Sequence, residues 1–255
     1  TGDRNTAVGT GSLLTHNVTD DSDTLNTAVG YNSLNLLTTG FCNTSLGALS
    51  LESSTTAARS TAVGYGTLQA NTTGNYNFAG GYYSLTSNTT ASNNTAVGYK
   101  TLEANTTGSG NVGIGYEAAL ANTTGGALTA IGVQALKSNT TANDCTAVGY
   151  QALVNNTTGG QNTAVGVLSL EDNTTGAYNS AVGNYALGNC TTGAYNVAVG
   201  RSAGIGITTG HYNTAVGTNC LGTIQTPHYN TAIGYAVLNV ANNSSGYNTG
   251  TGFYS

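Results

Sequence analysis

A short motif recurs along the whole chain at an almost constant spacing. The pentapeptide Asn-Thr-Ala-Val-Gly, or a close variant, begins at residues 5, 26, 43, 60, 77, 94, 111, 128, 145, 162, 179, 196, 213, 230 and 248. Every interval between residues 26 and 230 is 17 residues, whereas the first interval is 21 residues and the last is 18. Self-similarity at a fixed period of this kind predicts a repeat architecture, in which each unit packs on its sequence neighbours.

The same spacing predicts how the chain is organised. We expect a single repeat domain over residues 1–255, with units in strict phase from residue 26 to residue 246. An irregular first interval covers residues 5–25, and a last unit covers residues 248–255. The terminal units carry no obvious polar cap, so we expect the chain to be a segment of a longer fibre.

Comparing the units shows what each position of the repeat tolerates. We number the columns from the Asn of the motif, so that equivalent residues share a column. Column 5 is always Gly, column 3 is always Ala, Ser or Gly, and column 4 is nearly always Val, Ile or Leu. Column 9 is mostly Leu, and column 14 is Thr in every unit from Thr39 to Thr226. A β-branched stretch bounded by Gly and Asn predicts a strand, and Asn-Thr-Thr-Gly predicts a turn.

The sequence therefore predicts an all-β chain folded as a parallel β-solenoid (β-helix or β-roll) of about fifteen 17-residue coils, each with two or three short strands. Columns 4 and 9 are expected to form the core, at Val29, Leu34, Val63, Leu68, Val97, Leu102, Val148, Leu153, Val165, Leu170, Val182, Leu187, Val216 and Leu221. Columns 3 and 5 would then face outward. Because both stay small, either the Gly supplies a bend or a positive φ, or a neighbouring chain packs closely there. The recurrent Asn of column 1 predicts a hydrogen-bonded ladder.

The low charge of the chain argues against several kinds of partner. Only 6% of the residues are charged, the net charge is −5, and the five basic residues are scattered. Phosphate binding needs clustered Lys and Arg, and no apolar run approaches the length of a membrane-spanning helix. We therefore expect no nucleic acid partner and no membrane span.

Side chains that could carry chemistry are few and fall in unrelated columns. His16, His211 and His228 have no acid or nucleophile in a matching column, and no general acid–base pair is present. The acidic run at residues 20–23 could chelate Ca²⁺ but lacks the rest of a loop motif, which favours a solvated insertion. The cysteines fit no zinc pattern and are expected to be small buried hydrophobic residues, at Cys42, Cys145, Cys190 and Cys220. The sequence thus predicts no enzyme, no cofactor and no metal.

The turn at columns 12 to 14 suggests a modification. Asn-Thr-Thr is an acceptor sequence for N-linked glycans in secreted proteins. It recurs in column 12 at Asn71, Asn88, Asn105, Asn122, Asn139, Asn156 and Asn173, with weaker matches elsewhere at Asn17, Asn43, Asn93, Asn155, Asn189, Asn242 and Asn243. Alternatively, Asn-Thr-Thr-Gly only forms the turn through side-chain-to-backbone hydrogen bonds. The adjacent Thr pairs could instead bear O-linked sugars.

Two columns are rich in Tyr. They are column 6, with Tyr31, Tyr65, Tyr82, Tyr99, Tyr116, Tyr150 and Tyr235, and column 17, with Tyr76, Tyr178, Tyr195, Tyr212 and Tyr229. Such stripes could bind carbohydrate or another surface, or they could cover the ends of the core while the hydroxyls stay in water. A Thr array on a solenoid is also typical of ice-binding surfaces. Those surfaces use Thr two residues apart, however, whereas Thr72 and Thr73 are adjacent and would point to opposite sides of a strand.

The motif itself resembles that of a known class of surface proteins. The segments 26–30 and 230–234, Asn-Thr-Ala-Val-Gly and Asn-Thr-Ala-Ile-Gly, resemble the head repeats of YadA-type trimeric autotransporter adhesins. The chain is also similar to the repeat regions of tail-fibre-like proteins of phages and bacteria. This resemblance implies a β-roll or β-helix, often a homotrimer, that serves as a surface fibre or an adhesive rod.

One expectation for the function and two alternatives follow. We expect a structural extracellular fibre or filament segment at a cell or virion surface, which could carry covalent glycans. Its partners would be further copies of itself, joined end to end or as a homotrimer. The alternative is an adhesin or a receptor-binding tail-fibre head that recognises surface glycans, and a more distant one is an ice-binding protein.

Overall fold

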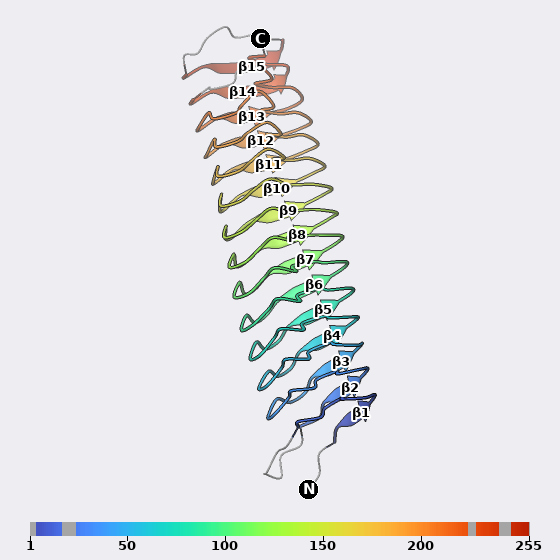
Figure 1. Cartoon of the computed structure of the whole chain (residues 1–255). Helices are drawn as coiled ribbons and strands as arrows, with labels where there is room; N and C mark the ends of the chain where they lie inside the picture. The colour runs from blue at the N-terminus through green and yellow to red at the C-terminus, as the bar shows by residue number, and fades with distance from the viewer. Residues whose placement is uncertain (1–3, 17–23, 224–227, 240–245, 255) are drawn as a thin grey trace. The chain divides into compact units, whose positions relative to one another are not determined.

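The computed structural model describes residues 4–16, 24–223, 228–239 and 246–254, and these residues form fifteen strands and no helix (Figure 1). The strands are β1 (Thr6–Val8), β2 (Thr27–Val29), β3 (Thr44–Leu46), β4 (Thr61–Val63), β5 (Phe78–Gly80), β6 (Thr95–Val97), β7 (Val112–Ile114), β8 (Thr129–Ile131), β9 (Thr146–Val148), β10 (Thr163–Val165), β11 (Ser180–Val182), β12 (Val197–Val199), β13 (Thr214–Val216), β14 (Thr231–Tyr235) and β15 (Thr249–Phe253). Each repeat unit supplies one strand, which begins at column 2.

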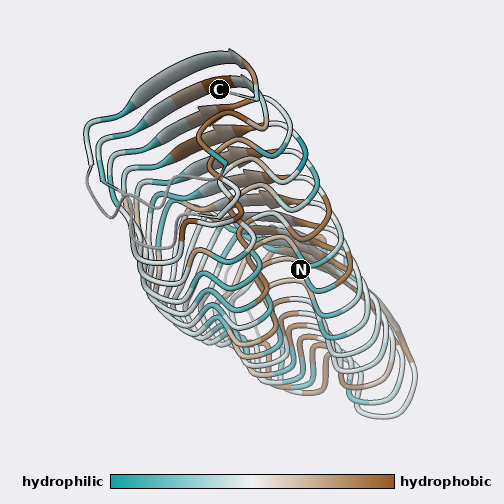
Figure 2. Ribbon diagram, turned by 90° about the horizontal axis from the view of Figure 1, so that it is seen from above, coloured by the Kyte–Doolittle hydropathy of each residue, from teal (hydrophilic) through white to brown (hydrophobic). Residues whose placement is uncertain are grey.

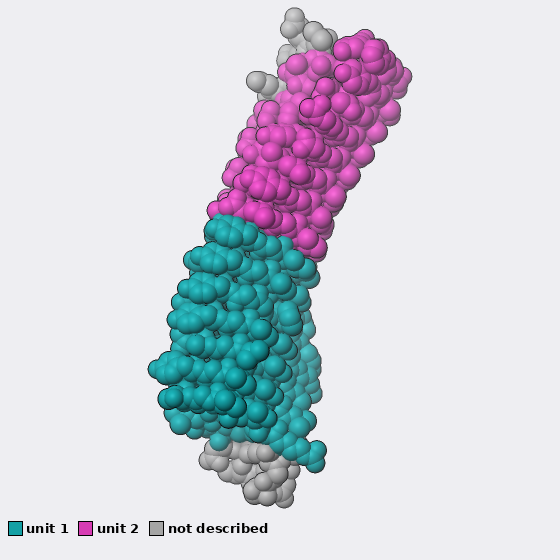
Figure 3. Space-filling model, turned by 90° about the vertical axis from the view of Figure 1, so that its right-hand side faces the viewer, with its two compact units in different colours: residues 1–127 teal, residues 128–255 magenta. Residues whose placement is uncertain are grey.

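The chain divides into two compact units, Thr1–Ala127 and Leu128–Ser255 (Figure 3). The first contains β1 to β7 and the second contains β8 to β15. Within each unit every strand pairs in parallel with the next strand along the chain, and the same columns face each other in the ladder. One 17-residue block therefore closes one coil, and the predicted parallel β-solenoid is confirmed.

The coils contain one short strand each, not the two or three that the sequence predicts. The reason is a set of left-handed residues in columns 7, 9 and 17, such as Gln151, Leu153 and Tyr195, with φ of 52°, 53° and 59°. These residues interrupt the extended backbone on the other sides of the coil. Hydrogen bonding from coil to coil continues there, since the Leu153 N–H donates to the carbonyl oxygen of Ser169 at 3.0 Å.

The interior of most coils contains a Leu from column 9 and an Ala from column 3. The predicted core residues of column 9 are fully buried, at Leu34, Leu68, Leu102, Leu153, Leu170, Leu187 and Leu221. Column 3 also points inward, because a Cβ built on Gly113 would lie 3.3 Å from Cδ1 of Leu102. Only the small residues Ala, Ser and Gly occur at this inward position beside the Leu.

The prediction that column 4 belongs to the core is wrong. Since column 3 points inward, the alternation along the strand turns column 4 outward. Four of its predicted core residues are 37–41% exposed, namely Val63, Val97, Val165 and Val182. The other three are half-buried, namely Val29, Val148 and Val216.

The small residues of columns 3 and 5 are explained within the chain. Gly149 of column 5 has a φ of 140°, and a Cβ built on it would lie 2.5 Å from the carbonyl oxygen of Gly166 in the next coil. Column 3 is small because it lies inside. Of the two predicted alternatives, the positive φ is therefore confirmed, and the small columns give no support to a neighbouring chain.

The Asn ladder predicted for column 1 is also confirmed. In the first unit the Asn43 N–H donates to Oδ1 of Asn26 at 2.9 Å. In the second unit the Asn196 N–H donates to Oδ1 of Asn179 at 3.0 Å, and Nδ2 of Asn196 donates to the carbonyl oxygen of Gly210 at 2.8 Å. Residues of similar hydropathy line up from coil to coil as continuous stripes (Figure 2).

Candidate functional site

The outward side of the strands is uncharged in both units. Columns 2 and 4 point outward, and no residue at these columns in any of the fifteen strands is charged. Column 4 exposes β-branched side chains, as at Val97 (38%), Ile114 (40%), Val199 (41%) and Ile233 (45%). Contiguous exposed apolar surface on a folded protein marks an interaction site. We call the residues of columns 2 and 4 the sheet face.

The structure places the seven main glycosylation candidates inside the coils. All of column 12 from Asn71 to Asn122 and from Asn139 to Asn173 is fully buried. Within the turn, Nδ2 of Asn105 donates to the carbonyl oxygen of Gly108 at 2.9 Å. Between coils, Nδ2 of Asn122 donates to Oδ1 of Asn105 at 2.8 Å.

The second unit repeats this arrangement, since Nδ2 of Asn173 donates to Oδ1 of Asn156 at 2.7 Å. An N-linked glycan is attached to this same nitrogen, and a buried amide leaves no space for it. The prediction of N-glycosylation at Asn71, Asn88, Asn105, Asn122, Asn139, Asn156 and Asn173 is therefore wrong, and the turn-forming alternative is confirmed. The apolar residues Leu37 and Ile207 in the same column were the sequence signal of burial.

The weaker glycosylation matches fall into three groups. Asn43 is fully buried in the column 1 ladder, so it cannot carry a glycan in this fold. Asn93, Asn155 and Asn189 are exposed and stay predictions. The remaining matches lie outside the described residues, at Asn17, Asn242 and Asn243.

Two stripes of Tyr are exposed and stacked along the coils. In the first unit the rings of Tyr82 and Tyr99 in column 6 lie 5.6 Å apart at an angle of 5°. In the second unit the rings of Tyr195 and Tyr212 in column 17 lie 4.9 Å apart at 6°. Each ring in the middle of a stripe is therefore covered on its faces by its neighbours and presents its edge and hydroxyl to solvent. Stacking on a sugar needs a free ring face, so the geometry does not favour the carbohydrate-binding alternative.

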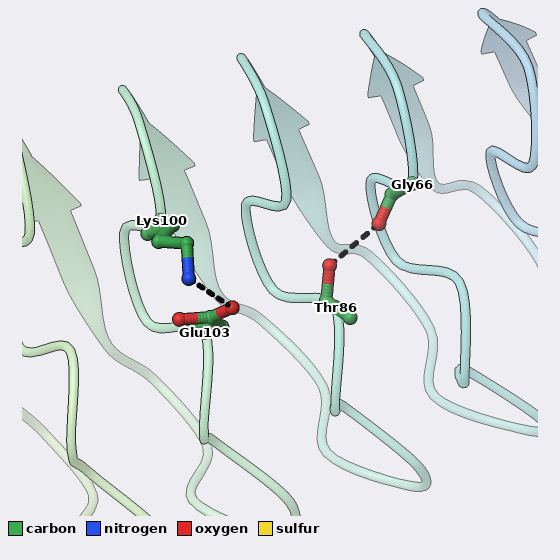
Figure 4. Close-up of polar contacts among 4 residues, drawn as sticks. All are labelled: Gly66, Thr86, Lys100 and Glu103. Carbon is green, nitrogen blue, oxygen red and sulfur yellow. Dashed lines mark hydrogen bonds and ion pairs between the residues drawn. The ribbon is translucent and has the colours of Figure 1, made fainter.

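Two of the basic side chains, Lys100 and Arg59, make contacts within the chain. Nζ of Lys100 lies 3.1 Å from Oε1 of Glu103 in the same coil (Figure 4). Arg59 lies over two aromatic rings, with its guanidinium carbon 4.7 Å and 5.4 Å from their centroids. The close-up also shows the hydroxyl of Thr86 donating to the carbonyl oxygen of Gly66 at 2.6 Å, an example of side-chain bonding between coils (Figure 4).

The histidines take part in packing of the coils. His211 and His228 occupy column 16 and stack with ring centroids 5.3 Å apart. Nδ1 of His211 accepts a hydrogen bond from the Ala194 N–H at 3.0 Å, and His16 lies 3.1 Å from the hydroxyl of Thr24. In the described part of the chain no group of three or more His, Cys, Asp or Glu could hold a metal ion. The acidic run at residues 20–23 lies outside the described residues.

Three of the four cysteines are buried as predicted. Cys145, Cys190 and Cys220 are fully buried, whereas Cys42 is exposed, which corrects the prediction for that residue. All four are free thiols. Burial raises the pKa of Cys190 to about 12, so this thiol is protonated at neutral pH.

Among the residues that the structure describes, no helix is long and apolar enough to cross a membrane.

Comparison with known proteins adds no relative. No family model, no curated protein and no solved structure matches the chain. The resemblance to autotransporter heads and tail-fibre repeats therefore stays a prediction from the motif. A function has to account for an uncharged sheet face, exposed Tyr stripes and buried amide ladders.

Proposed function

We propose that the chain is a segment of a structural fibre whose coils pack side by side with further copies of the chain. The β-solenoid supplies a repetitive unit in which backbone and side chains bond from coil to coil. The observation that carries the proposal is the outward position of column 4. Apolar β-branched side chains there stay 37–45% exposed at Val165, Val182, Val199 and Ile233. The role is mechanical, not catalytic.

A second copy of the same chain fits the sheet face better than an unrelated partner does. The face has no charge to desolvate, so burying it costs little. Its rows repeat at the strand spacing of ~4.8 Å, and a second copy has rows with the same spacing. Face-to-face packing of two sheets at ~10 Å would bury Val and Thr methyl groups in a shared core. The resemblance to autotransporter heads and tail fibres implies an assembly that is often a homotrimer, and a location outside a cell or on a virion.

The test is a pair of charged variants with matched positions. The variant Val165→Lys/Val182→Lys places two charges on the sheet face, and Asn155→Lys/Asn189→Lys places two charges on exposed residues elsewhere on the coils. We expect the wild type and the Asn variant to form an oligomer, and the Val variant to be a monomer with an unchanged circular dichroism spectrum. Native mass spectrometry and analytical ultracentrifugation measure both. A wild type that stays monomeric at every concentration contradicts the proposal.

Glycan recognition by an adhesin or a receptor-binding head predicts a different result. A glycan array probed with the wild type would then show binding that Tyr195→Ala abolishes, regardless of the oligomeric state. The fibre proposal expects no such binding, because the ring faces in the stripe are covered by neighbouring rings.

A further inference from the structure

The Thr side chains of the adjacent columns 13 and 14 differ in their hydrogen bonding. In column 13 the hydroxyl is part of the structure, because it donates to the carbonyl oxygen of the column 13 residue in the next coil. The distance is 3.0 Å from Thr72 to Thr89 and 3.0 Å from Thr157 to Thr174. This hydroxyl ladder explains why column 13 is Thr.

Column 14 is Thr in one unit more than column 13, although no hydrogen bond of its hydroxyl occurs in the described part of the chain. All eleven described members are exposed, at Thr39, Thr56, Thr73, Thr90, Thr107, Thr124, Thr141, Thr158, Thr175, Thr192 and Thr209. Several of their backbone N–H groups bond to the next coil, as from Thr158 to the carbonyl oxygen of Thr174 at 3.2 Å, which any residue except Pro could do. None of them has a positive φ. Backbone geometry and burial therefore leave the residue type open.

Column 17 shows how an equally exposed column behaves. It is exposed in every described coil from Cys42 to Tyr229, and it holds Cys, Arg, Tyr, Asn, Gly, Ala, Asp and Gln. An exposed column of this solenoid thus varies freely when only folding constrains it. The uniform Thr of column 14 points to a requirement for its hydroxyl that lies outside the fold.

We propose that column 14 is a row of O-glycosylation sites. In the reaction, Oγ1 of Thr attacks the anomeric carbon of a nucleoside-diphosphate sugar. The new glycosidic C–O bond forms as the bond from the anomeric carbon to phosphate breaks. The nucleoside diphosphate leaves with the bonding electrons, the hydroxyl proton passes to a base of the transferase, and nothing is oxidised or reduced.

Electrostatic repulsion favours glycosylation over phosphorylation, the other common modification of Thr. Phosphate groups would carry ~1.5 to 2 negative charges each and would stand ~4.8 Å apart along the row, with strong mutual repulsion. Neutral sugars avoid this repulsion. They would also add hydrated groups to the surface of a chain in which only 6% of the residues are charged. The inference does not depend on packing through the sheet face.

The first experiment uses the chain isolated from the cells that make it. Peptide mapping by electron-transfer mass spectrometry should find whole sugar residues on column 14 Thr and none on column 13 Thr, and alkaline β-elimination should remove them. Two triple variants, one in each column and matched position by position, sharpen the assignment. Thr73→Val, Thr107→Val and Thr158→Val together should lose three sugars, whereas Thr72→Val, Thr106→Val and Thr157→Val together should lose none. A mass equal to the bare polypeptide overturns the proposal.

A second measurement separates modification from a structural role. Val keeps the β-branched shape of Thr and removes only the hydroxyl. In sugar-free chain from bacteria without O-glycosylation, the column 13 triple variant should lower the midpoint of urea unfolding, and the column 14 triple variant should leave it unchanged. An equal drop for both variants would show that column 14 is Thr for folding, and the proposal would fall.

Discussion

The interior of the coils and the sheet face each depart from the usual distribution of side chains. The interior holds Ala, Leu and fully buried amides such as Asn156, while the sheet face exposes aliphatic residues such as Val165. Proteins usually bury their β-branched aliphatic residues and leave Asn outside. Here the amides have to be inside, because they satisfy backbone and side-chain groups at the turns that neighbouring coils would otherwise leave without partners.

The difference shows which surface is complete in a single chain. Most of the buried amides in the interior are paired, either from coil to coil or within a turn. The sheet face gains nothing from its Val side chains within the chain, since they remain in water. Changes in the interior should therefore alter the stability of the isolated chain, and changes on the sheet face should alter its association.

The largest effect is expected from a charge inside the Asn ladder. Nδ2 of Asn156 donates to Oδ1 of Asn139 at 3.0 Å, and its own Oδ1 accepts from Asn173 at 2.7 Å. The variant Asn156→Asp cannot donate and buries a carboxylate, so the free energy of unfolding should fall by about 3–5 kcal/mol. The control Asn156→Leu brings in no charge and should cost about 1–2 kcal/mol. Urea unfolding at neutral pH measures both, and equal losses would mean that the site is open to water.

A pair of aliphatic truncations tests the comparison directly. Leu153 is fully buried and Val165 is 37% exposed. Leu153→Ala should lower the free energy of unfolding by about 3 kcal/mol, because it leaves a cavity inside the coil, whereas Val165→Ala should cost less than about 1 kcal/mol. Both are measured at concentrations where the chain does not associate. A larger loss for Val165→Ala would reverse the assignment of inside and outside.

Part of this arrangement could be predicted from the sequence. The strict 17-residue period predicts that equivalent residues pair, as Thr146 and Thr163 do. Column 9 could be predicted as core because it is Leu in most units. The Asn ladder of column 1 could be predicted because a stacked amide has its partner in the identical residue of the next coil.

Which side of the strand points into the coil could not be predicted in this way. Period-two alternation says that columns 3 and 4 face opposite ways, but it does not say which is inside. The structure puts the smaller residue inside because the Leu of column 9 fills the coil. That Leu is itself left-handed, as at Leu153 with a φ of 53°, and a Leu carries no sequence signal for a conformation that usually calls for Gly or Asn. Hence the path of the coil could not be predicted from residue types, although Leu37 and Ile207 in column 12 did signal that this column is buried.

The buried thiol of Cys190 provides a test, with a smaller expected effect, of how well the coils exclude water. Burial raises the pKa of Cys190 from 9.0 to about 12. Below pH 9 the thiol is protonated in both the folded and the unfolded chain, so it adds no pH dependence. Above pH 9 the unfolded chain releases the proton first, and stability should fall by ~1.4 kcal/mol per pH unit, or about 2 kcal/mol by about pH 10.5. Cys190→Ala should lack this component, and the difference between the two chains measures it by urea unfolding.

The smallest effect concerns the outer surface itself. Tyr195 stacks between Tyr178 at 4.7 Å and Tyr212 at 4.9 Å, although its side chain is 45% exposed. Tyr195→Ala should cost about 0.5–1.5 kcal/mol, since it removes two stacked ring contacts. Tyr150→Ala is the matched control, because Tyr150 is exposed to a similar extent and its column neighbours are Val133 and Val167. Thermal unfolding followed by near-ultraviolet circular dichroism distinguishes the two variants. If both cost the same, ring stacking adds nothing, and the stability of the single chain comes from the interior and the backbone ladders.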